Sequence, residues 1–231
     1  MQPANEEHLD LAQPVARIPR GSLVLLLDDD EGLREAFTWM FESEDIDFKG
    51  FSNFEMFQKV LFKYLEGKKS LCLLLDLRMP SISGLEVFEW IKQQGVSLSR
   101  LPIIFLTGHG DISTAVETVK NGAFDFYEKP ATDHRLINRV RQALSLSSDF
   151  LDQQDNMRCW INRINKLSPR EREVMFLVAK GKLNKVIASE LDISLRTVEV
   201  HRSNLFEKLR VRSAAELATL LSDISSRLGF V

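Results

Sequence analysis

The chain has 231 residues, enough for one large domain or two ordinary ones, and 44% hydrophobic with 27% charged residues is typical of globular proteins. Two cysteines exclude a disulfide framework and apolar runs of about five residues exclude a membrane span, so we expect a cytoplasmic protein with reduced thiols. The net charge of −3 divides unevenly: residues 21–144 hold 14 Lys and Arg against 19 Asp and Glu, and residues 166–231 hold 12 against 8. This asymmetry predicts two domains, the second of which binds a polyanion.

Residues 1–20 come before the first predicted element. They contain three prolines and charged side chains of both signs, without the apolar core of a signal peptide. We expect a mobile tail.

From Leu23 to about Leu144, short apolar runs alternate with amphipathic stretches. Strands that are buried on both faces appear as continuous apolar runs, so five such units in succession predict a parallel sheet covered by helices. We expect an α/β domain over residues 21–146 with the flavodoxin-like strand order 2-1-3-4-5. The predicted strands are 23–27, 46–51, 71–75, 102–106 and 123–127, and the helices lie near 31–44, 53–66, 84–94, 111–121 and 132–144.

Polar residues stand where these strands end. The first strand runs into Asp28 and Asp29, and the third ends at Asp76. The fourth ends at Thr107, and Lys129 follows the fifth. Since these strand ends are neighbours in the expected order, three carboxylates, a hydroxyl and an ammonium should share one cleft. Carboxylate oxygens suit Mg²⁺, and a Lys with a Thr suits the oxygens of a phosphoryl group.

Each of these residues also has a simpler interpretation. Asp30 is placed to cap the next helix, and its neighbours can be solvated at a strand end. Thr107 before a glycine can start a turn, and Lys129 before a proline can be an ordinary loop residue. Phe126 is by default a core aromatic. Only their joint occurrence favours a site.

The order DDD…DLRMPSISG…TGHGD…EKP over residues 22–146 resembles the receiver domain of bacterial two-component response regulators. This resemblance implies that Asp76 is the phosphoacceptor, which takes phosphate from a sensor histidine kinase. It implies that Asp28 and Asp29 hold Mg²⁺, with the main-chain carbonyl of Arg78 as a further ligand. It also implies that Lys129 pairs with the phosphorylated aspartate.

Two further residues match the switch of that family. The resemblance implies that the Thr107 hydroxyl moves to the phosphoryl group while the ring of Phe126 turns inward, an electrostatic event that biases a bistable element. The expected consequence is a rearranged surface around the fourth helix, fifth strand and fifth helix.

An enzyme is the alternative interpretation of this domain. Residues 28–30 contain the D-x-D spacing of haloacid-dehalogenase-like phosphatases, which would make Asp28 the nucleophile. That interpretation leaves Asp76 and the DLRMP segment without a role, and no substrate-specificity cap is visible. We therefore expect no enzyme activity beyond self-phosphotransfer and autodephosphorylation.

Residues 147–165 connect the two halves. They contain no Pro or Gly, and their apolar residues give a partial helical stripe. We expect either that the last receiver helix continues or that a separate helix follows, up to about Asn165. Trp160 and Ile164 can pack on the next domain, on a partner chain, or only on their own domain.

Residues 166–231 contain the signals of four short helices. Ser168 is an N-cap, Pro169 occupies the first helical position and Glu171 completes a capping box. A tight turn at residues 192–194 predicts a helix-turn-helix arrangement. The other expected helices run from about Lys185, with Asn184 as cap, to Leu191, over about 195–210, and from a second capping box of Ser213 and Glu216.

The third of these helices has two different faces. At 100° per residue, its apolar side consists of Val198, Leu205 and Leu209. The opposite side carries polar residues, and a recognition helix presents such N-terminal turns to the major groove. Arg196, Glu199, Val200 and Ser203 form this outward side, and Glu207 shares it further along.

The run LSPREREV…NKVIASELDISLRTVEVHRSNLFEKL resembles the LuxR-type DNA-binding domain, and the whole chain resembles the NarL/FixJ class, with TGHGD and TVEVHR most similar to its FixJ-like branch. Many relatives carry Lys in place of Glu199. The Glu199 carboxylate can either accept a hydrogen bond from a cytosine amine or support a neighbouring Arg. Leu183 replaces a common hydroxyl residue. The resemblance assigns groove contacts to Glu199, Val200 and Ser203, phosphate contacts to Lys185, Arg196, Thr197, Arg202 and Lys208, and contact or support to His201.

Together these resemblances predict a two-domain response regulator. Phosphorylation of Asp76 should favour a homodimer that binds promoter DNA on two half-sites, with RNA polymerase as a further partner and no membrane involved. The competing prediction is a receiver that controls protein docking through a helical module with a solvated basic face. That alternative predicts no salt-sensitive DNA binding.

Overall fold

The computed structural model describes residues 18–108, 118–130 and 134–228. The chain separates into two compact units, Met1–Asp152 and Gln153–Val231. Apart from residues 18–20, the predicted tail lies outside the described residues, and so does most of the helix expected near 111–121. None of the described helices combines the length and apolar character needed to cross a bilayer.

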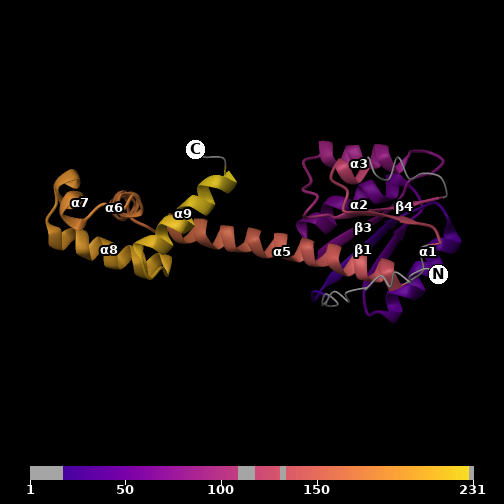
Figure 1. The fold of residues 1–231 in the computed structure, drawn as a ribbon, viewed down its shortest axis with the longest axis horizontal. Coiled ribbons are helices and arrows are strands. Elements are labelled where there is room, and N and C mark those ends of the chain that lie inside the picture. Colours follow the sequence, from indigo (N-terminus) through magenta and orange to yellow (C-terminus); the bar gives the residue numbers. More distant parts are fainter. Residues whose placement is uncertain (1–17, 109–117, 131–133, 229–231) are drawn as a thin grey trace, which may run out of the picture. The chain divides into compact units, whose positions relative to one another are not determined.

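The first unit contains a parallel sheet in the order β2-β1-β3-β4-β5, which confirms the predicted order (Figure 1). Runs of leucine in β1 and β3 pair in register, with Leu23 opposite Leu71, and both strands are buried along their whole length. The described strands are β1 (Ser22–Leu27), β2 (Asp47–Phe51), β3 (Ser70–Asp76), β4 (Ile103–Thr107) and β5 (Asp125–Glu128).

Helices cover both faces of this sheet. Alternate residues of each strand point to opposite faces, so the leucines divide between two cores. One core lies under α2 (Phe54–Glu66) and α3 (Gly84–Gln93), and the other under α1 (Glu31–Ser43) and α5 (His134–Asn165). Cys72 of β3 lies in the second core, and burial raises the pKa of its thiol far above the ordinary range.

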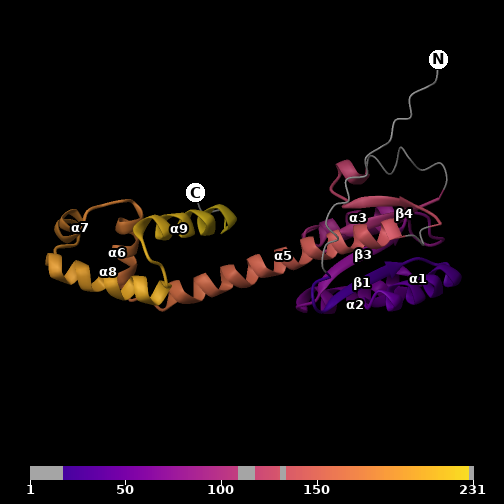
Figure 2. The same ribbon diagram turned by 60° about the horizontal axis from the view of Figure 1, so that its bottom comes forward.

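Helix α5 is continuous over 32 residues, so the connector takes the first of its two predicted forms (Figure 2). Its last buried residue in the first unit is Ser147. In the second unit, Trp160 and Ile164 pack against the core of the following helices, which is the first of the three environments expected for them.

Arg100 and Ser147 form a hydrogen-bond network near the start of β3, at the end of the strand opposite to Asp76. The Arg100 guanidinium is buried and donates to the Ser147 hydroxyl at 3.2 Å and to four main-chain carbonyls. The hydroxyl in turn donates to the Arg100 carbonyl at 2.8 Å and accepts from the Leu71 amide at 2.9 Å. This network joins α2, β3 and α5 without a carboxylate.

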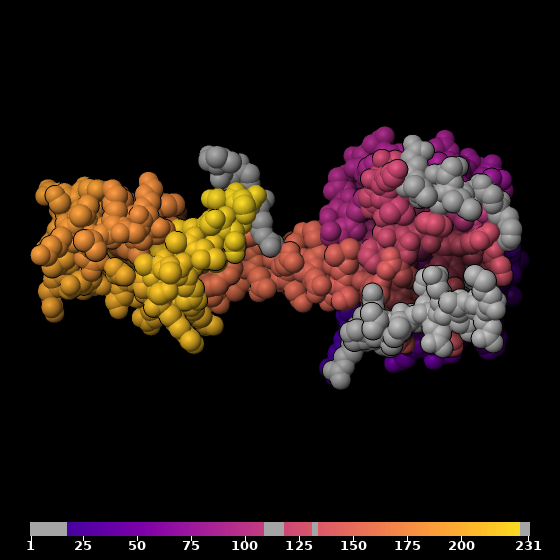
Figure 3. Space-filling view, viewed as in Figure 1, coloured from indigo at the N-terminus to yellow at the C-terminus, as the bar shows by residue number. Residues whose placement is uncertain are grey.

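The second unit packs its helices around one core, and Figure 3 shows their side chains as a continuous body. Ser168 and Glu171 form the predicted capping box, and Ser213 accepts from the Glu216 amide at 3.1 Å as expected of a cap. The Glu216 carboxylate accepts from the Arg212 amide. The helices are α6 (Pro169–Ala179), α7 (Asn184–Leu191), α8 (Leu195–Leu209) and α9 (Ala214–Leu228).

The predicted cap of α7 is wrong. The N-cap position belongs to Leu183, whose side chain makes no cap hydrogen bond, and Asn184 is the first helical residue. The Asn184 side-chain oxygen instead accepts from Arg202 of α8 at 2.8 Å. A tertiary hydrogen bond therefore uses the amide side chain that local sequence signals assigned to capping.

We expect Ser147→Ala to destabilise the first unit by about 1–3 kcal/mol, because it leaves the Leu71 amide and one Arg100 donor buried without their acceptor. Urea-dependent hydrogen exchange of the β3 amides measures this free energy. Ser148→Ala, next to it on α5, is the matched control, and equal effects of both changes would contradict the role of the buried hydroxyl.

Candidate functional site

The three predicted carboxylates come together where β1 and β3 end. One oxygen from each of Asp28, Asp29 and Asp76 lies within 4.8 Å of the others, and Asp28 and Asp76 are buried while Asp29 is exposed. The strands are neighbours in the sheet, so their consecutive ends carry the acids to one edge. This set contains only hard oxygen donors, which fits a magnesium ion.

Lys129 balances this negative charge. Its ammonium lies 2.8 Å from Asp28 Oδ2 and 2.7 Å from Asp76 Oδ1. The other oxygen of Asp28 accepts from the Asp30 amide at 2.9 Å. The Lys129 amide donates to the Thr107 carbonyl at 2.8 Å, which fixes the lysine to the end of β4. Asp30 itself caps α1 through the Leu33 amide, as predicted.

The pKa values in the cleft show the competition between burial and charge. Burial raises the pKa of the Asp76 carboxyl, and nearby Asp28 adds to this, although hydrogen bonds from Lys129 and the Arg78 amide oppose it. Burial alone would lower the pKa of Lys129, but its two carboxylate partners hold it above the ordinary value. Asp76 is therefore a carboxylate whose charge is poorly solvated, and the lysine remains an ammonium.

The expected switch residues lie on the two strands that follow β3 in the sheet, Thr107 on β4 and Phe126 on β5. Thr107 is buried at the end of β4, one residue beyond Leu106, which pairs with Asp76. Phe126 in β5 is half-buried and packs on the core beneath α2 and α3, opposite Phe105. The Arg78 amide reaches Asp76, so the loop after β3 wraps the carboxylate.

Two residues of the site were missed from the sequence. Gly84 begins α3, and a Cβ atom there would lie 2.3 Å from the main-chain oxygen of Asp76. Arg34 of α1 donates to the Asp28 carbonyl at 2.9 Å. Gly84 directly follows Ser83, the N-cap of α3, and this position was a usable signal for the glycine. Nothing in the local pattern indicated Arg34.

The second candidate site is the outward face of α8. The helical phase is confirmed, because Val198, Leu205 and Leu209 are fully buried. The turn before α8 uses Asp192 in a left-handed conformation and Ser194 as N-cap, which accepts from the Thr197 amide at 3.0 Å. The exposed residues of this candidate interface are Arg196, Glu199, Val200, Ser203 and Lys208 of α8 and Lys185 of α7, whereas Thr197, His201 and Arg202 are partly buried.

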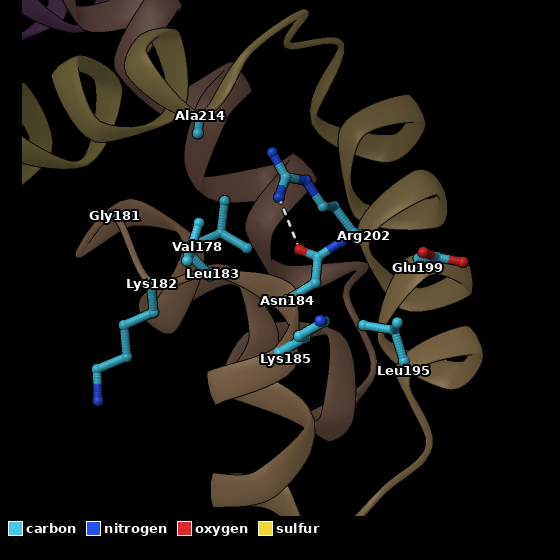
Figure 4. Close-up of a pocket in the computed structure, with 10 residues that line it drawn as sticks. All are labelled: Val178, Gly181, Lys182, Leu183, Asn184, Lys185, Leu195, Glu199, Arg202 and Ala214. Carbon is cyan, nitrogen blue, oxygen red and sulfur yellow. Dashed lines mark hydrogen bonds between the residues drawn. The ribbon is translucent and has the colours of Figure 1, made fainter.

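Two of the predicted phosphate-contacting cations have partners inside the domain. Arg202 reaches across to Asn184 (Figure 4). Its guanidinium also lies over the ring of Phe206, 5.3 Å from the ring centroid. The Lys208 ammonium lies 2.7–2.8 Å from both carboxylate oxygens of buried Glu171. These two side chains tie α8 to α7 and α6, so the structure gives them a role in the fold as well.

Comparison with known proteins matches each of the two compact units to a separate family. Residues 24–141 match the family described as "Response regulator receiver domain", and residues 165–221 match "Bacterial regulatory proteins, luxR family". The chain belongs to the NarL/FixJ class of two-component response regulators.

Relatives of this response regulator match almost their whole length. The response regulator protein TodT of Pseudomonas putida is 36% identical over 209 residues, covering 90% of this chain and 89% of that protein. The transcriptional regulatory protein FixJ of Bradyrhizobium diazoefficiens is 36% identical over 197 residues, 85% of this chain and 93% of that protein. The structure of the response regulator StyR is 33% identical with a TM-score of 0.75, covering 88% of this chain and 99% of that one.

We expect Gly84→Ala to destabilise the first unit by roughly 1–3 kcal/mol and to slow phosphorylation by a small phosphodonor, because its Cβ must displace the main chain of Asp76. Urea unfolding and the phosphorylation rate measure the two effects. Gly108→Ala is the control, since no atom of the described residues, its chain neighbours apart, lies within 4 Å of its added Cβ. An unchanged rate in Gly84→Ala would contradict the close packing of α3 against the site.

We expect Asp76→Asn to stabilise the metal-free receiver at pH 7. Because the folded-state pKa of Asp76 is raised, its ionised form costs free energy above that pKa. Below about pH 4, the ordinary pKa of an aspartate, both folded and unfolded states are protonated and the gain disappears. Urea unfolding in chelator across this range tests the trend. A gain that grows with acidity, or an equal gain in exposed Asp47→Asn, would contradict it.

Proposed function

We propose that Asp76 is the residue through which phosphorylation controls this response regulator. Residues 21–146 would form the receiver, 147–165 the helical linker and 166–231 the DNA-binding domain. The observation that carries the assignment is the buried Asp76 carboxylate, held between Lys129 at 2.7 Å and two further aspartates at one edge of the sheet.

The proposed reaction is transfer of a phosphoryl group from a phosphohistidine of a sensor kinase. An Asp76 oxygen attacks phosphorus, the P–N bond breaks, and the imidazole leaves with the electron pair as the new P–O bond forms. Burial leaves the unphosphorylated carboxylate poorly solvated, and a poorly solvated carboxylate is a stronger nucleophile toward phosphorus. No further enzyme activity is proposed beyond this transfer and the hydrolysis of its product.

Asp28, Asp29, Asp76 and the Arg78 carbonyl would hold Mg²⁺. A bound magnesium ion neutralises charge on the transferred oxygens and on the clustered carboxylates. The three carboxylates already lie within 4.8 Å of one another. Lys129 faces the same oxygens and would pair with the phosphoryl group of Asp76.

The signal would leave the site through Thr107 and Phe126. The Thr107 side chain is buried beside the phosphoacceptor, and Phe126 belongs to the next strand. A hydroxyl drawn to the new phosphoryl oxygens vacates space that the half-buried ring can enter, which changes the surface around β5 and α5. We propose that this surface then supports a homodimer.

The output would be sequence-specific binding of α8 to promoter DNA in the cytoplasm. The exposed Arg196 and Lys185 suit phosphates, and the N-terminal turns of α8 suit the major groove. The remaining residues of the proposed interface are Thr197, Glu199, Val200, His201, Arg202, Ser203 and Lys208. A dimer would bind two half-sites and act on transcription through contact with RNA polymerase.

The deciding experiment combines intact-mass analysis with retention of genomic DNA fragments. Wild type, Asp76→Ala and the exposed control Asp47→Ala are incubated with a small phosphodonor, with Mg²⁺ or with chelator. We expect Mg²⁺-dependent phosphorylation of wild type and Asp47→Ala only, with DNA binding tightened roughly 5- to 150-fold. This range is the usual strength of coupling between two sites.

The other outcomes are equally informative. Phosphorylation of Asp76→Ala would assign the phosphoacceptor elsewhere. Equal DNA binding by all variants would remove Asp76 from control of DNA binding. Absence of salt-sensitive DNA retention from every sample would replace the DNA-binding role with protein docking.

A further inference from the structure

We propose that Glu199 determines sequence specificity by accepting a hydrogen bond from a cytosine amine in the major groove. This inference rests on the proposed DNA-binding function and names the base that one side chain would select. Glu199 belongs to α8, and the sequence of the chain alone left two interpretations of this residue open: contact with a base, or support of a neighbouring arginine.

Glu199 is positioned on the part of α8 that enters a groove. It lies in the second turn of the helix and is exposed, next to fully buried Val198. Val200 beside it is 50% exposed, so the outward surface here combines one carboxylate with an apolar side chain. The N-terminal turns of a recognition helix meet base edges rather than only phosphates.

No cation neutralises Glu199 within the described part of the chain. Arg202, one turn further along α8, donates to Asn184 at 2.8 Å and lies over Phe206. Figure 4 shows the Glu199 carboxylate directed away from the Arg202 guanidinium. Arg196, one turn earlier, likewise has no ion pair with it among the described residues. The structure therefore favours base contact over support of an arginine.

Three other glutamates of the same unit differ in this respect, whereas Glu207, near the other end of α8, has no ion pair among the described residues either. Glu171 pairs with Lys208, and Glu190 pairs with Lys182. Glu173 lies 2.7 Å from Arg170. An unpaired carboxylate on the face that approaches a polyanion is unfavourable by charge alone, so it requires a compensating donor on the DNA.

The chemistry of the major groove identifies that donor. Cytosine N4 and adenine N6 are the amines presented there, and adenine places the acceptor N7 beside its amine. The second oxygen of a carboxylate is repelled by N7, whereas cytosine offers no adjacent acceptor of its own. A carboxylate therefore prefers cytosine, and the isosteric amide prefers adenine because it can donate to N7 and accept from N6.

The test is selection of binding sites from randomised DNA duplexes by the full chain treated with phosphodonor and Mg²⁺. We expect wild type to prefer cytosine at one position of each half-site, roughly 5- to 150-fold over other bases. Glu199→Gln should shift that position to adenine, and Glu199→Ala should make it indifferent. Glu207→Gln is the matched control, since Glu207 is another exposed acid of α8 without an ion pair among the described residues.

An unchanged preference in Glu199→Gln, or the same shift in Glu207→Gln, would overturn the inference. Selection of sites by wild type without a cytosine position that responds to residue 199 would overturn it while leaving DNA binding intact. If wild type selects no sites at all, the proposed function fails, and this inference fails with it. Circular dichroism of the exposed-site variants checks that each one folds.

Discussion

The ammonium of Lys129 lies between two buried carboxylates, 2.8 Å from Asp28 and 2.7 Å from Asp76, where the parallel strands end. Without a cation at this place, carboxylates on neighbouring strands would repel one another in a region with little solvent. The main-chain hydrogen bond from Lys129 to Thr107 couples this charge to the end of β4. Geometry of the sheet and neutralisation of the cleft therefore depend on each other, and any new charge on Asp76 must change both.

Charged side chains are arranged differently in the two units. The first gathers acids into one cleft and leaves Arg100, near the start of β3, surrounded by neutral acceptors. The second pairs three of its six glutamates with lysines or arginines internally, as Glu171 does with Lys208. Its exposed α8 surface therefore retains the side chains that can face DNA. The formal charges of the halves indicated two tasks, but this internal pairing determines which side chains remain available.

Much of the fold follows from local patterns. Continuous leucine runs predicted β1 and β3 because both faces of these strands are buried, and Ser168 with Glu171 marked the start of α6 because a capping box involves only four consecutive residues. The acidic cluster was predictable because strand order brings its members together. Long-range contacts were not: Arg100 meets Ser147 across 47 positions, and Asn184 abandons capping for Arg202. The periodicity of apolar residues along the chain does not predict such long-range hydrogen bonds.

The two cysteines lie in contrasting environments. Cys72 is enclosed in β3, where the raised pKa of its thiol suppresses the reactive thiolate, while Cys159 is exposed on α5. The native chain thus carries one accessible thiol, one residue before Trp160, whose ring stacks with Arg163. A maleimide fluorophore can be attached there without mutagenesis. The wild-type protein can therefore be labelled at a single site, on the helix that runs from the receiver to the output domain.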